Sequence, residues 1–321
     1  MKRIGVFTSG GDAPGMNACI RAVVRTALYY KIEVFGIYRG YSGMIRGEIV
    51  KMESKDVSNI MQHGGTILQS ARSETFRTKP GRAKAFKQLK KLGIEGLVAI
   101  GGDGTFSGAS IFAEEYPVSI VGVPGTIDND LYGSDFTLGY DTAVNTAVSC
   151  IDNIKDTANS HNRLFFIEVM GRDAGFIALR SGIASGAEAV LIPEEKTDVE
   201  ELIKTLDKNY KRKKSSSIVV VAEGKTGGAF EVAEMVKKRF AHYDMRVTVL
   251  GHLQRGGRPS AFDRVLASRL GMEAVKALRS GKKGVMVGQI HNRIEYTPFE
   301  KACKHNIGIS PIMLEMVNIL S

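Results

Sequence analysis

Short apolar runs alternate along this chain with stretches in which apolar residues recur at helical spacing. Residues 4–7 form the first run, a glycine-rich turn follows, and residues 16–28 then carry an apolar stripe. This order predicts a strand, a loop and a helix. Further runs, each predicting a strand, occupy residues 97–100, 120–123, 165–169, 190–192, 218–222, 247–250 and 285–287.

Helical patterns between these runs indicate repeated βαβ units. They cover residues 83–92, 199–210, 230–240 and 262–278. Because the apolar runs are continuous, we expect strands covered on both faces, as in a parallel sheet. The fold class is therefore α/β and doubly wound. So many strands predict two mostly parallel, Rossmann-like lobes with the active site in the cleft between them. Near the chain end, a packed helix face is expected from Ile312, Met313, Met316 and Leu320.

The composition excludes several classes of protein. With 43% hydrophobic and 24% charged residues, the 321-residue chain is typical of a globular protein rather than a disordered or collagen-like one. The longest apolar runs fall short of the roughly 18 residues of a membrane span, and the opening residues do not form a signal peptide. A cytoplasmic location is therefore expected. Three widely spaced cysteines, expected to be reduced and buried, suit neither disulfides nor a metal site: Cys19, Cys150 and Cys303.

The net charge of +10 leaves three kinds of anionic partner open: nucleic acid, anionic lipid and small phosphorylated ligands. A nucleic-acid-binding protein is one hypothesis, and it predicts steeply salt-dependent binding. However, the basic residues are scattered, tryptophan is absent and aromatic residues make up only 7%, so a stacking platform for bases is hard to find. Arginines lie instead beside glycine-rich turns, which favours small phosphorylated ligands over nucleic acid.

The first glycine-rich turn lies between a predicted strand and a predicted helix. Free backbone N–H groups and the helix dipole attract anions at such a place. Gly10 and Gly15 have the spacing of a P-loop. However, Met16 and Asn17 stand where that motif needs a lysine and a hydroxyl residue, so we reject a P-loop.

Two further turns each follow a predicted strand. In the segment GGDGT at 101–105, glycines would let a phosphate chain approach, and Asp103 could ligate Mg²⁺ or simply cap the next helix. The segment PGTIDND at 124–130 places Asp128 and Asp130 two residues apart, near Thr126. Two neighbouring carboxylates repel each other, so the pair does not stabilise the fold. It suits catalysis, because one carboxylate can accept a proton from a hydroxyl while the other orients Mg²⁺ or raises its neighbour's basicity.

Six segments, in order, resemble the signatures of the bacterial ATP-dependent 6-phosphofructokinases (the phosphofructokinase A family). They are GGDAPGMN at 10–17, GGTIL at 64–68, GGDGT at 101–105, PGTIDND at 124–130, VMGR at 169–172 and GHLQRGG at 251–257. The resemblance implies a glycolytic kinase that uses Mg²⁺ and transfers the γ-phosphoryl group of ATP to the 1-hydroxyl of fructose 6-phosphate. It also implies an ATP-binding lobe of residues 1–138 plus 252–304 and a fructose 6-phosphate-binding lobe of residues 139–251 plus 305–321.

The same resemblance implies roles for single residues. Asp128 would be the general base, Thr126 would steady the transferred group, and Asp130 would assist. Catalysis would also use Arg72 and Arg172, which offset charge on the phosphoryl group. The residues implied for ATP are Gly11, Arg72, Gly102, Asp103, Gly104 and Thr105, with Asp103 also holding Mg²⁺. Those implied for fructose 6-phosphate are Thr126, Asp128, Arg163, Met170, Gly171, Arg172, Glu223, Arg246, His252 and Arg255.

Assembly and regulation are implied as well. In the family, the arginines matching Arg163 and Arg246 reach a neighbouring subunit's site, so the resemblance implies a homotetramer. It implies an effector site for ADP and phosphoenolpyruvate at Arg21, Arg25, Lys155, Glu188, Arg212 and Lys214. A solvated helix face would equally explain Arg21 and Arg25. Asp173 and Arg258 depart from the family by adding charge near the sugar site.

The phosphoryl donor leaves an alternative open. Pyrophosphate-dependent relatives carry an aspartate at the position of Gly104 and a lysine at that of Gly125. Glycine at both positions leaves room for the α-phosphate of a nucleotide, so ATP is favoured. A pyrophosphate-dependent phosphofructokinase is the alternative.

Overall fold

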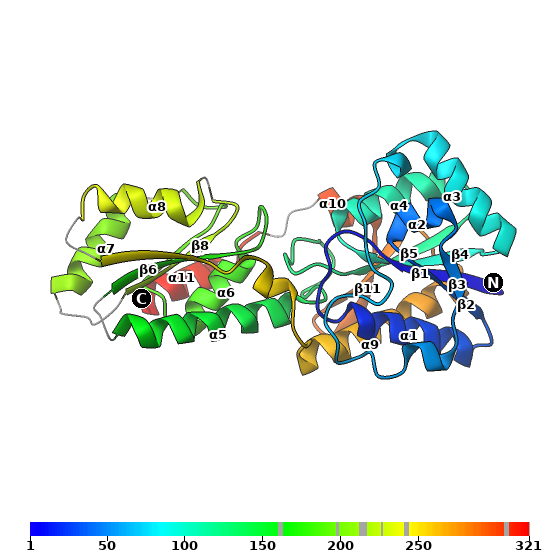
Figure 1. Ribbon diagram of the computed structural model, residues 1–321, viewed down its shortest axis with the longest axis horizontal. Helices are drawn as coiled ribbons and strands as arrows, with labels where there is room; N and C mark the ends of the chain where they lie inside the picture. Colours follow the sequence, from blue (N-terminus) through cyan, green and yellow to red (C-terminus); the bar gives the residue numbers. More distant parts are fainter. Residues whose placement is uncertain are drawn as a thin grey trace. The chain divides into compact units, whose positions relative to one another are not determined.

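The chain folds into two compact units, shown in a computed structural model (Figure 1). The structure describes residues 1–159, 163–196, 199–211, 217–225, 227–240, 244–304 and 308–320. The first unit contains Met1–Asp141 and Arg255–Ile307, and the second contains Thr142–Gln254 and Gly308–Ser321. The chain passes from the first unit into the second within helix α5 (Tyr140–Asn159).

The first unit is built on a seven-stranded sheet with the strand order β11-β10-β5-β4-β1-β2-β3. The central strands pair in parallel, as the apolar runs predict, whereas the edge strands β3 and β11 pair antiparallel. Neither edge strand was expected, because β3 has only three residues and β11 alternates polar and apolar ones. The strands are β1 (Arg3–Thr8), β2 (Glu33–Ile37), β3 (Ile49–Lys51), β4 (Gly96–Gly101), β5 (Ser119–Pro124), β10 (Val285–Ile290) and β11 (Arg293–Pro298).

Helices cover both faces of this sheet (Figure 1). Helices α1 (Met16–Tyr29) and α9 (Ala261–Arg279) lie on one face. The other face carries α2 (Gly40–Arg46), α3 (Lys79–Leu92), α4 (Asp103–Glu115) and α10 (Phe299–Lys304). Every residue of β4 is buried, which explains its continuous apolar run. Short 3₁₀ turns, η1 (Ser54–Val57) and η2 (Thr75–Arg77), lie between β3 and α3.

The second unit contains a four-stranded parallel sheet in the order β7-β8-β6-β9. Its strands are β6 (Arg163–Val169), β7 (Ala189–Leu191), β8 (Ser217–Ala222) and β9 (Asp244–Val249). Helices α7 (Val199–Lys211) and α8 (Gly228–Lys237) cover one face, and α5 and α6 (Phe176–Ser185) lie on the other (Figure 1). Helix α11 (Pro311–Leu320) packs against α6, and the 3₁₀ turn η3 (Gly251–Arg255) follows β9.

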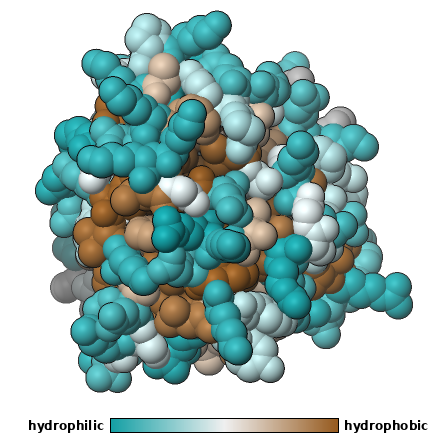
Figure 2. Space-filling view, turned by 90° about the vertical axis from the view of Figure 1, so that its right-hand side faces the viewer, coloured by the Kyte–Doolittle hydropathy of each residue, from teal (hydrophilic) through white to brown (hydrophobic). Residues whose placement is uncertain are grey.

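The surface corrects two sequence-based expectations. In α11, Ile312, Met316 and Leu320 are 64%, 37% and 65% exposed and Met313 is half-buried, so most of the face that we expected to be packed is exposed. Of the cysteines only Cys19 is buried, whereas Cys150 and Cys303 are half-buried. One face of the first unit shows hydrophilic side chains with apolar atoms between them (Figure 2), the usual state of a protein surface. Among the described helices, none is long and apolar enough to cross a membrane.

The carboxyl ends of β5, β4 and β1 lie next to one another in the first unit. β1 connects onward to β2 on one side, while β4 and β5 lie on its other side. The direction of the chain across the sheet therefore reverses between β1 and β4. Doubly wound sheets bind their ligands at such a reversal. The three glycine-containing turns singled out in the sequence leave the sheet at this point.

Candidate active site

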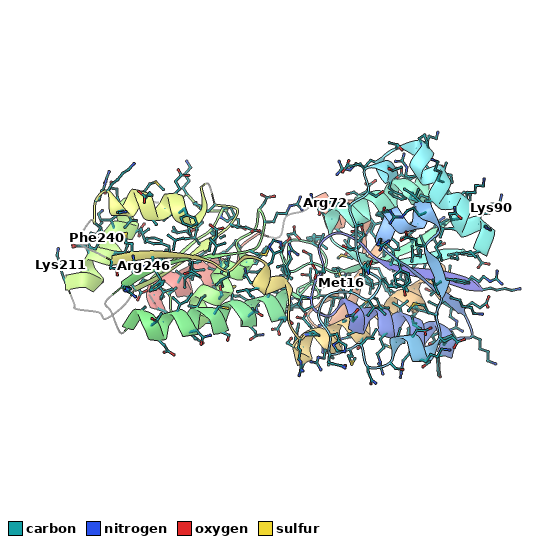
Figure 3. The ribbon with its side chains drawn as sticks, in the orientation of Figure 1. Met16, Arg72, Lys90, Lys211, Phe240 and Arg246 are labelled. Atoms are coloured by element: carbon teal, nitrogen blue, oxygen red, sulfur yellow. The ribbon has the colours of Figure 1, made fainter. Side chains whose placement is uncertain are left out.

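Hydrogen bonds join the turn after β1 to the turn after β4. The Ser9 backbone N–H donates to the Ile100 carbonyl oxygen at 3.0 Å, and the Thr105 hydroxyl donates to the Ser9 carbonyl oxygen at 3.2 Å. The Ser70 hydroxyl donates to the Gly10 carbonyl oxygen, which brings the segment before Arg72 beside the same turn. Arg72 itself is exposed on the first unit (Figure 3). Gly11, Arg72 and Thr105 therefore belong to one connected edge of the first unit.

Arg255 lies against the turn after β1. Its Nη1 donates to the Asp12 carbonyl oxygen at 3.3 Å. A Cβ atom added to Gly11 would lie 2.7 Å from that Nη1, so a larger residue there would displace the guanidinium group. Arg255 thus lies in the first unit, whereas the other sugar phosphate residues named between 163 and 252 lie in the second.

The glycines of the turn after β4 have different surroundings. A Cβ atom added to Gly101 would lie 2.4 Å from Thr105 Oγ1 and 2.5 Å from the Ser9 carbonyl oxygen, so glycine is required there by packing. On Gly104 it would meet nothing within 4 Å among the described residues. Open space therefore lies beside the first turn of α4, and the positive end of a helix dipole favours an anion there. Asp103 is the first residue of that helix.

Cys303 on α10 lies beside Asp103 at the start of α4. Its thiol donates to the Asp103 carbonyl oxygen at 3.4 Å. Burial raises the pKa of the Cys303 thiol, and the nearby negative charges of Asp103 and Asp130 add to the rise. The thiol is therefore neutral at physiological pH and unsuited to nucleophilic chemistry.

The loop after β5 is folded around a side chain that sequence reasoning passed over. Asn129 has a left-handed backbone, with φ of 54°, and is 6% exposed. Its Oδ1 accepts hydrogen bonds from the Thr137 backbone N–H at 2.8 Å and hydroxyl at 3.2 Å, and its Nδ2 donates to the Asp135 carbonyl oxygen at 3.2 Å. The Thr137 hydroxyl also donates to the Thr126 carbonyl oxygen at 2.6 Å.

The same loop carries the two aspartates, Asp128 and Asp130, on either side of Asn129. Thr126 and Asp128 are 8% and 7% exposed, and the Asp128 backbone N–H donates to the Thr126 hydroxyl at 3.2 Å. Asp130 is half-buried. Asn129, between the two aspartates, fixes the bend from which both carboxylates project. Its tolerance of positive φ was the signal in the sequence.

Residues 16 and 17, which exclude a P-loop, have structural functions instead. Met16 is fully buried at the start of α1 (Figure 3). Asn17 is 1% exposed and binds the segment that precedes Ser70. Its Nδ2 donates to the carbonyl oxygens of His63 and Gly64 at 3.1 and 3.2 Å, and its Oδ1 accepts from the Ile67 N–H at 2.8 Å. The GGTIL segment is therefore held against α1.

In the second unit, several residues named for the sugar phosphate meet at the carboxyl ends of adjacent strands. Residues 170–172 follow β6, Glu223 follows β8, and His252 follows β9. Glu223 Oε1 accepts from the backbone N–H groups of Gly171 and Arg172 at 3.3 and 2.8 Å. The Arg172 backbone is left-handed, with φ of 56°, so Glu223 stabilises an unusual bend.

Gln254 is a second residue that sequence reasoning missed. It is fully buried, its Oε1 accepts from the Met170 N–H at 3.3 Å, and its Nε2 donates to the Gly251 carbonyl oxygen at 3.2 Å. It therefore joins the bend after β6 to the turn that carries His252. The exposed side chain of Asp173 lies 3.7 Å from Arg172 Nε.

Arg163 and Arg246 lie at the opposite end of this sheet. Arg163 is the first residue of β6, and Arg246 is near the start of β9 (Figure 3). The length of a strand, roughly 20 Å for seven residues, separates Arg163 from the bend at Arg172. Within one chain these two groups of residues are therefore not brought together.

The residues named for effectors are divided between the units. Arg21 and Arg25 lie on α1, half-buried and exposed. In the second unit, Lys155 Nζ donates to the Ser185 carbonyl oxygen at 2.5 Å, and the buried Glu188 accepts from the Ile218 N–H at 2.5 Å. Arg212 and Lys214 lie outside the described residues. Among the described residues, no cluster of three or more His, Cys, Asp or Glu side chains could hold a metal ion without further ligands.

Comparison with known proteins agrees with this fold. The chain is 56% identical to an ATP-dependent 6-phosphofructokinase 2 of Bacteroides thetaiotaomicron, over 100% of this chain and 98% of that protein. It is 57% identical to an ATP-dependent 6-phosphofructokinase 1 of Thermus thermophilus, over 100% of both chains. The solved phosphofructokinase of Saccharomyces cerevisiae superposes with a TM-score of 0.91 at 37% identity, over 95% of this chain and 45% of that one. Since the phosphofructokinase family model also matches residues 3–278, this chain belongs to the phosphofructokinase family.

Proposed function

We propose that this protein is an ATP-dependent 6-phosphofructokinase, a glycolytic kinase that converts ATP and fructose 6-phosphate into ADP and fructose 1,6-bisphosphate. The observation that carries the proposal is the full-length similarity, at 56–57% identity, to proteins bearing that name. The glycine-rich turns at the reversal of the first sheet support it, because they expose backbone N–H groups where a phosphate chain can bind.

Asp128 is the general base of the proposed reaction. It takes the proton of the 1-hydroxyl as that oxygen forms its bond to the γ-phosphorus, while the bond from phosphorus to the β–γ bridging oxygen breaks and ADP leaves. The low exposure of Asp128 supports this role, since a desolvated carboxylate is a stronger base. Thr126 and Asp130 on the same loop steady the transferred group, and Arg72 and Arg172 offset its charge.

The nucleotide binds along the first unit in this proposal. Gly11, Gly102, Gly104 and Thr105 surround its phosphates, and the open space beside Gly104 supports this assignment. Mg²⁺ suits the residues present, because this ion commonly uses one or two carboxylates together with phosphate oxygens and water. Asp103 would hold it, and when bound it would neutralise charge on the phosphates.

Met170, Gly171, Arg172, Glu223 and His252 form the group at the carboxyl ends of the second sheet that we assign to the sugar phosphate. The family resemblance assigns Arg255, in the first unit, to the same ligand. Arg163 and Arg246 lie a strand's length from that group, so they would serve a site on another copy of the chain. This separation supports the homotetramer that the family resemblance implies.

Regulation by ADP and phosphoenolpyruvate extends the proposal. Arg21 and Arg25 offer guanidinium groups one helical turn apart, which suits a phosphate. Lys155 donates to the Ser185 carbonyl oxygen at the end of α6, and Glu188 accepts from the Ile218 N–H of β8, so an effector that bound these two side chains would replace those backbone partners.

One coupled assay tests the function. Fructose 6-phosphate is supplied with ATP or with pyrophosphate, each with and without Mg²⁺, and turnover is expected only with ATP and Mg²⁺. Asp128→Ala should lower kcat at least ~100-fold, the usual loss for a general base. Asp152→Asn, which alters an exposed carboxylate on α5, is the matched control and should turn over as the parent does. Turnover with pyrophosphate alone, or an Asp128→Ala loss below tenfold, would contradict the proposal.

A further inference from the structure

One carboxylate bridges two arginines at the edge of the second sheet. Asp244 Oδ2 lies 2.7 Å from Arg163 Nε, and Asp244 Oδ1 lies 2.7 Å from Arg246 Nη1. The side chains of Asp244, Arg163 and Arg246 are 42%, 28% and 53% exposed, respectively, so the group is accessible to a ligand. We refer to these three residues as the arginine bridge.

The strand register explains how the arginine bridge forms. Arg163 on β6 is paired in register with Asp244 on β9, and Phe165 is paired with Arg246. Side chains in register on parallel strands project from the same face, and residues two apart on one strand do so too. All three bridge residues therefore project from one face of the sheet, and Asp244 lies between the two guanidinium groups.

The bridge leaves donors on each arginine that could bind a second anion. Arg163 uses Nε for Asp244, so its terminal Nη1 and Nη2 lie beyond that contact. Arg246 uses Nη1, which also donates to the Met245 carbonyl oxygen at 3.1 Å. A phosphate presents paired oxygens much as a carboxylate does, and arginine forks bind both groups in the same manner. Two arginines that converge on one carboxylate are consequently placed to converge on a phosphate.

We propose that Asp244 is a positioning residue for the sugar phosphate site, which holds Arg163 and Arg246 at the spacing that the phosphate of the substrate requires. Two guanidinium groups on long side chains repel each other and lose conformational entropy when they are fixed. The carboxylate between them opposes both effects before the substrate arrives. This inference rests on the proposed function, because it takes Arg163 and Arg246 to bind fructose 6-phosphate.

The variant Asp244→Asn keeps the shape of the side chain and removes its charge. It should raise the KM for fructose 6-phosphate about tenfold, which is the loss of affinity expected when one partly exposed charge-assisted hydrogen bond is removed. The KM for ATP and kcat should stay within twofold of the parent. General misfolding would change all three parameters, so a change confined to the KM for fructose 6-phosphate indicates a local effect. Asp244→Glu keeps the charge and should recover part of the lost affinity.

Glu33 provides a matched control in the first unit. Its carboxylate also bridges two cations, Arg3 and Lys51, and its side chain is 38% exposed. Glu33→Gln makes the same change in net charge as Asp244→Asn, and it should leave the KM for fructose 6-phosphate unchanged.

A further variant distinguishes positioning from independent binding. In an Arg163→Ala/Arg246→Ala background both ion pairs of Asp244 are removed, so adding Asp244→Asn should change the KM by less than twofold. An unchanged or lowered KM in Asp244→Asn alone would overturn the inference, and a lowered value would make Asp244 a competitor of the phosphate. Absence of turnover in the parent would instead refute the proposed function itself.

Discussion

Asn129 provides the sharpest test of how the acidic loop is held. The substitution Asn129→Ala removes the acceptor of the Thr137 N–H and the donor to the Asp135 carbonyl oxygen. Thr137 is fully buried, so its N–H would lose its partner away from water, at a cost of about 1–3 kcal/mol. Alanine in the left-handed region adds about 1 kcal/mol. The free energy of unfolding should therefore fall by about 3 kcal/mol.

Two companion variants separate the causes. Asn129→Gly removes the same hydrogen bonds but tolerates φ of 54°, so it should be about 1 kcal/mol more stable than Asn129→Ala. Asn129→Asp keeps an acceptor for Thr137 but adds a carboxylate between Asp128 and Asp130. The midpoint of urea unfolding, measured at one protein concentration, should drop by about 1 M in Asn129→Ala for a slope of roughly 3 kcal/mol per M.

Activity should change together with stability in these variants. Because Asn129 fixes the bend that carries Asp128, Asn129→Ala should lower kcat at least tenfold, since small misplacement of a reacting group is costly. The KM for ATP should stay within twofold. If Asn129→Ala unfolds at the parent's urea concentration, or keeps half of its kcat, the view that this amide organises the loop is wrong.

Three further predictions concern the donor, the effectors and one ion pair. Gly104→Asp fills open space, so it should raise the KM for ATP at least tenfold while the thermal midpoint moves by less than about 2 °C; an unchanged KM would mean that the nucleotide binds elsewhere. Arg21→Ala should weaken the response to ADP and phosphoenolpyruvate while uninhibited turnover stays nearly unchanged, and equal responses in variant and parent would refute the effector assignment. The Arg82 guanidinium, which binds Glu115 through two hydrogen bonds of 2.7 Å, lowers the pKa of that carboxyl. A lowered pKa in the folded state stabilises the protein above the unfolded pKa and ceases to do so as pH falls through the folded value. Glu115→Gln should therefore reduce the urea midpoint at pH 7, and its difference from the parent should shrink below about pH 4.

Much of the fold could be predicted from the sequence, because the interior strands are covered on both faces and so consist of unbroken apolar runs. β4 and β8 are the clearest examples, with every residue buried. The edge strand β3 has only three residues, and β11 alternates polar and apolar residues over a short length, so neither forms a long apolar run. Helix α5 was missed although its buried residues Ala143, Ala147 and Ile151 recur at every fourth position.

The sequence predicts the positions of the turns that form the candidate site, because motifs mark them. Motifs identify the turns, but they do not show which side chains hold those turns in place. Asn17, Asn129 and Gln254 are buried amides whose hydrogen bonds reach backbone groups of other segments. Their partners are 50, 8 and 84 residues away in sequence, so local patterns cannot reveal them. The C-terminal helix was misjudged for a related reason, because apolar spacing predicts a face but does not reveal what covers it.

The glycines of the first unit illustrate why geometry must accompany motif reading. In the sequence, glycine at positions 104 and 125 favours a nucleotide donor to the same degree, because Gly104 and Gly125 would both leave room for its α-phosphate. In the structure a Cβ atom on Gly125 would lie 3.0 Å from both Ile100 Cγ2 and Met16 Cε, so close packing also favours glycine at that position. Around Gly104 the described residues leave the space open. The argument for a nucleotide donor therefore rests on Gly104, whose glycine no neighbouring atom requires, and a substitution there tests ligand binding without disturbing the core.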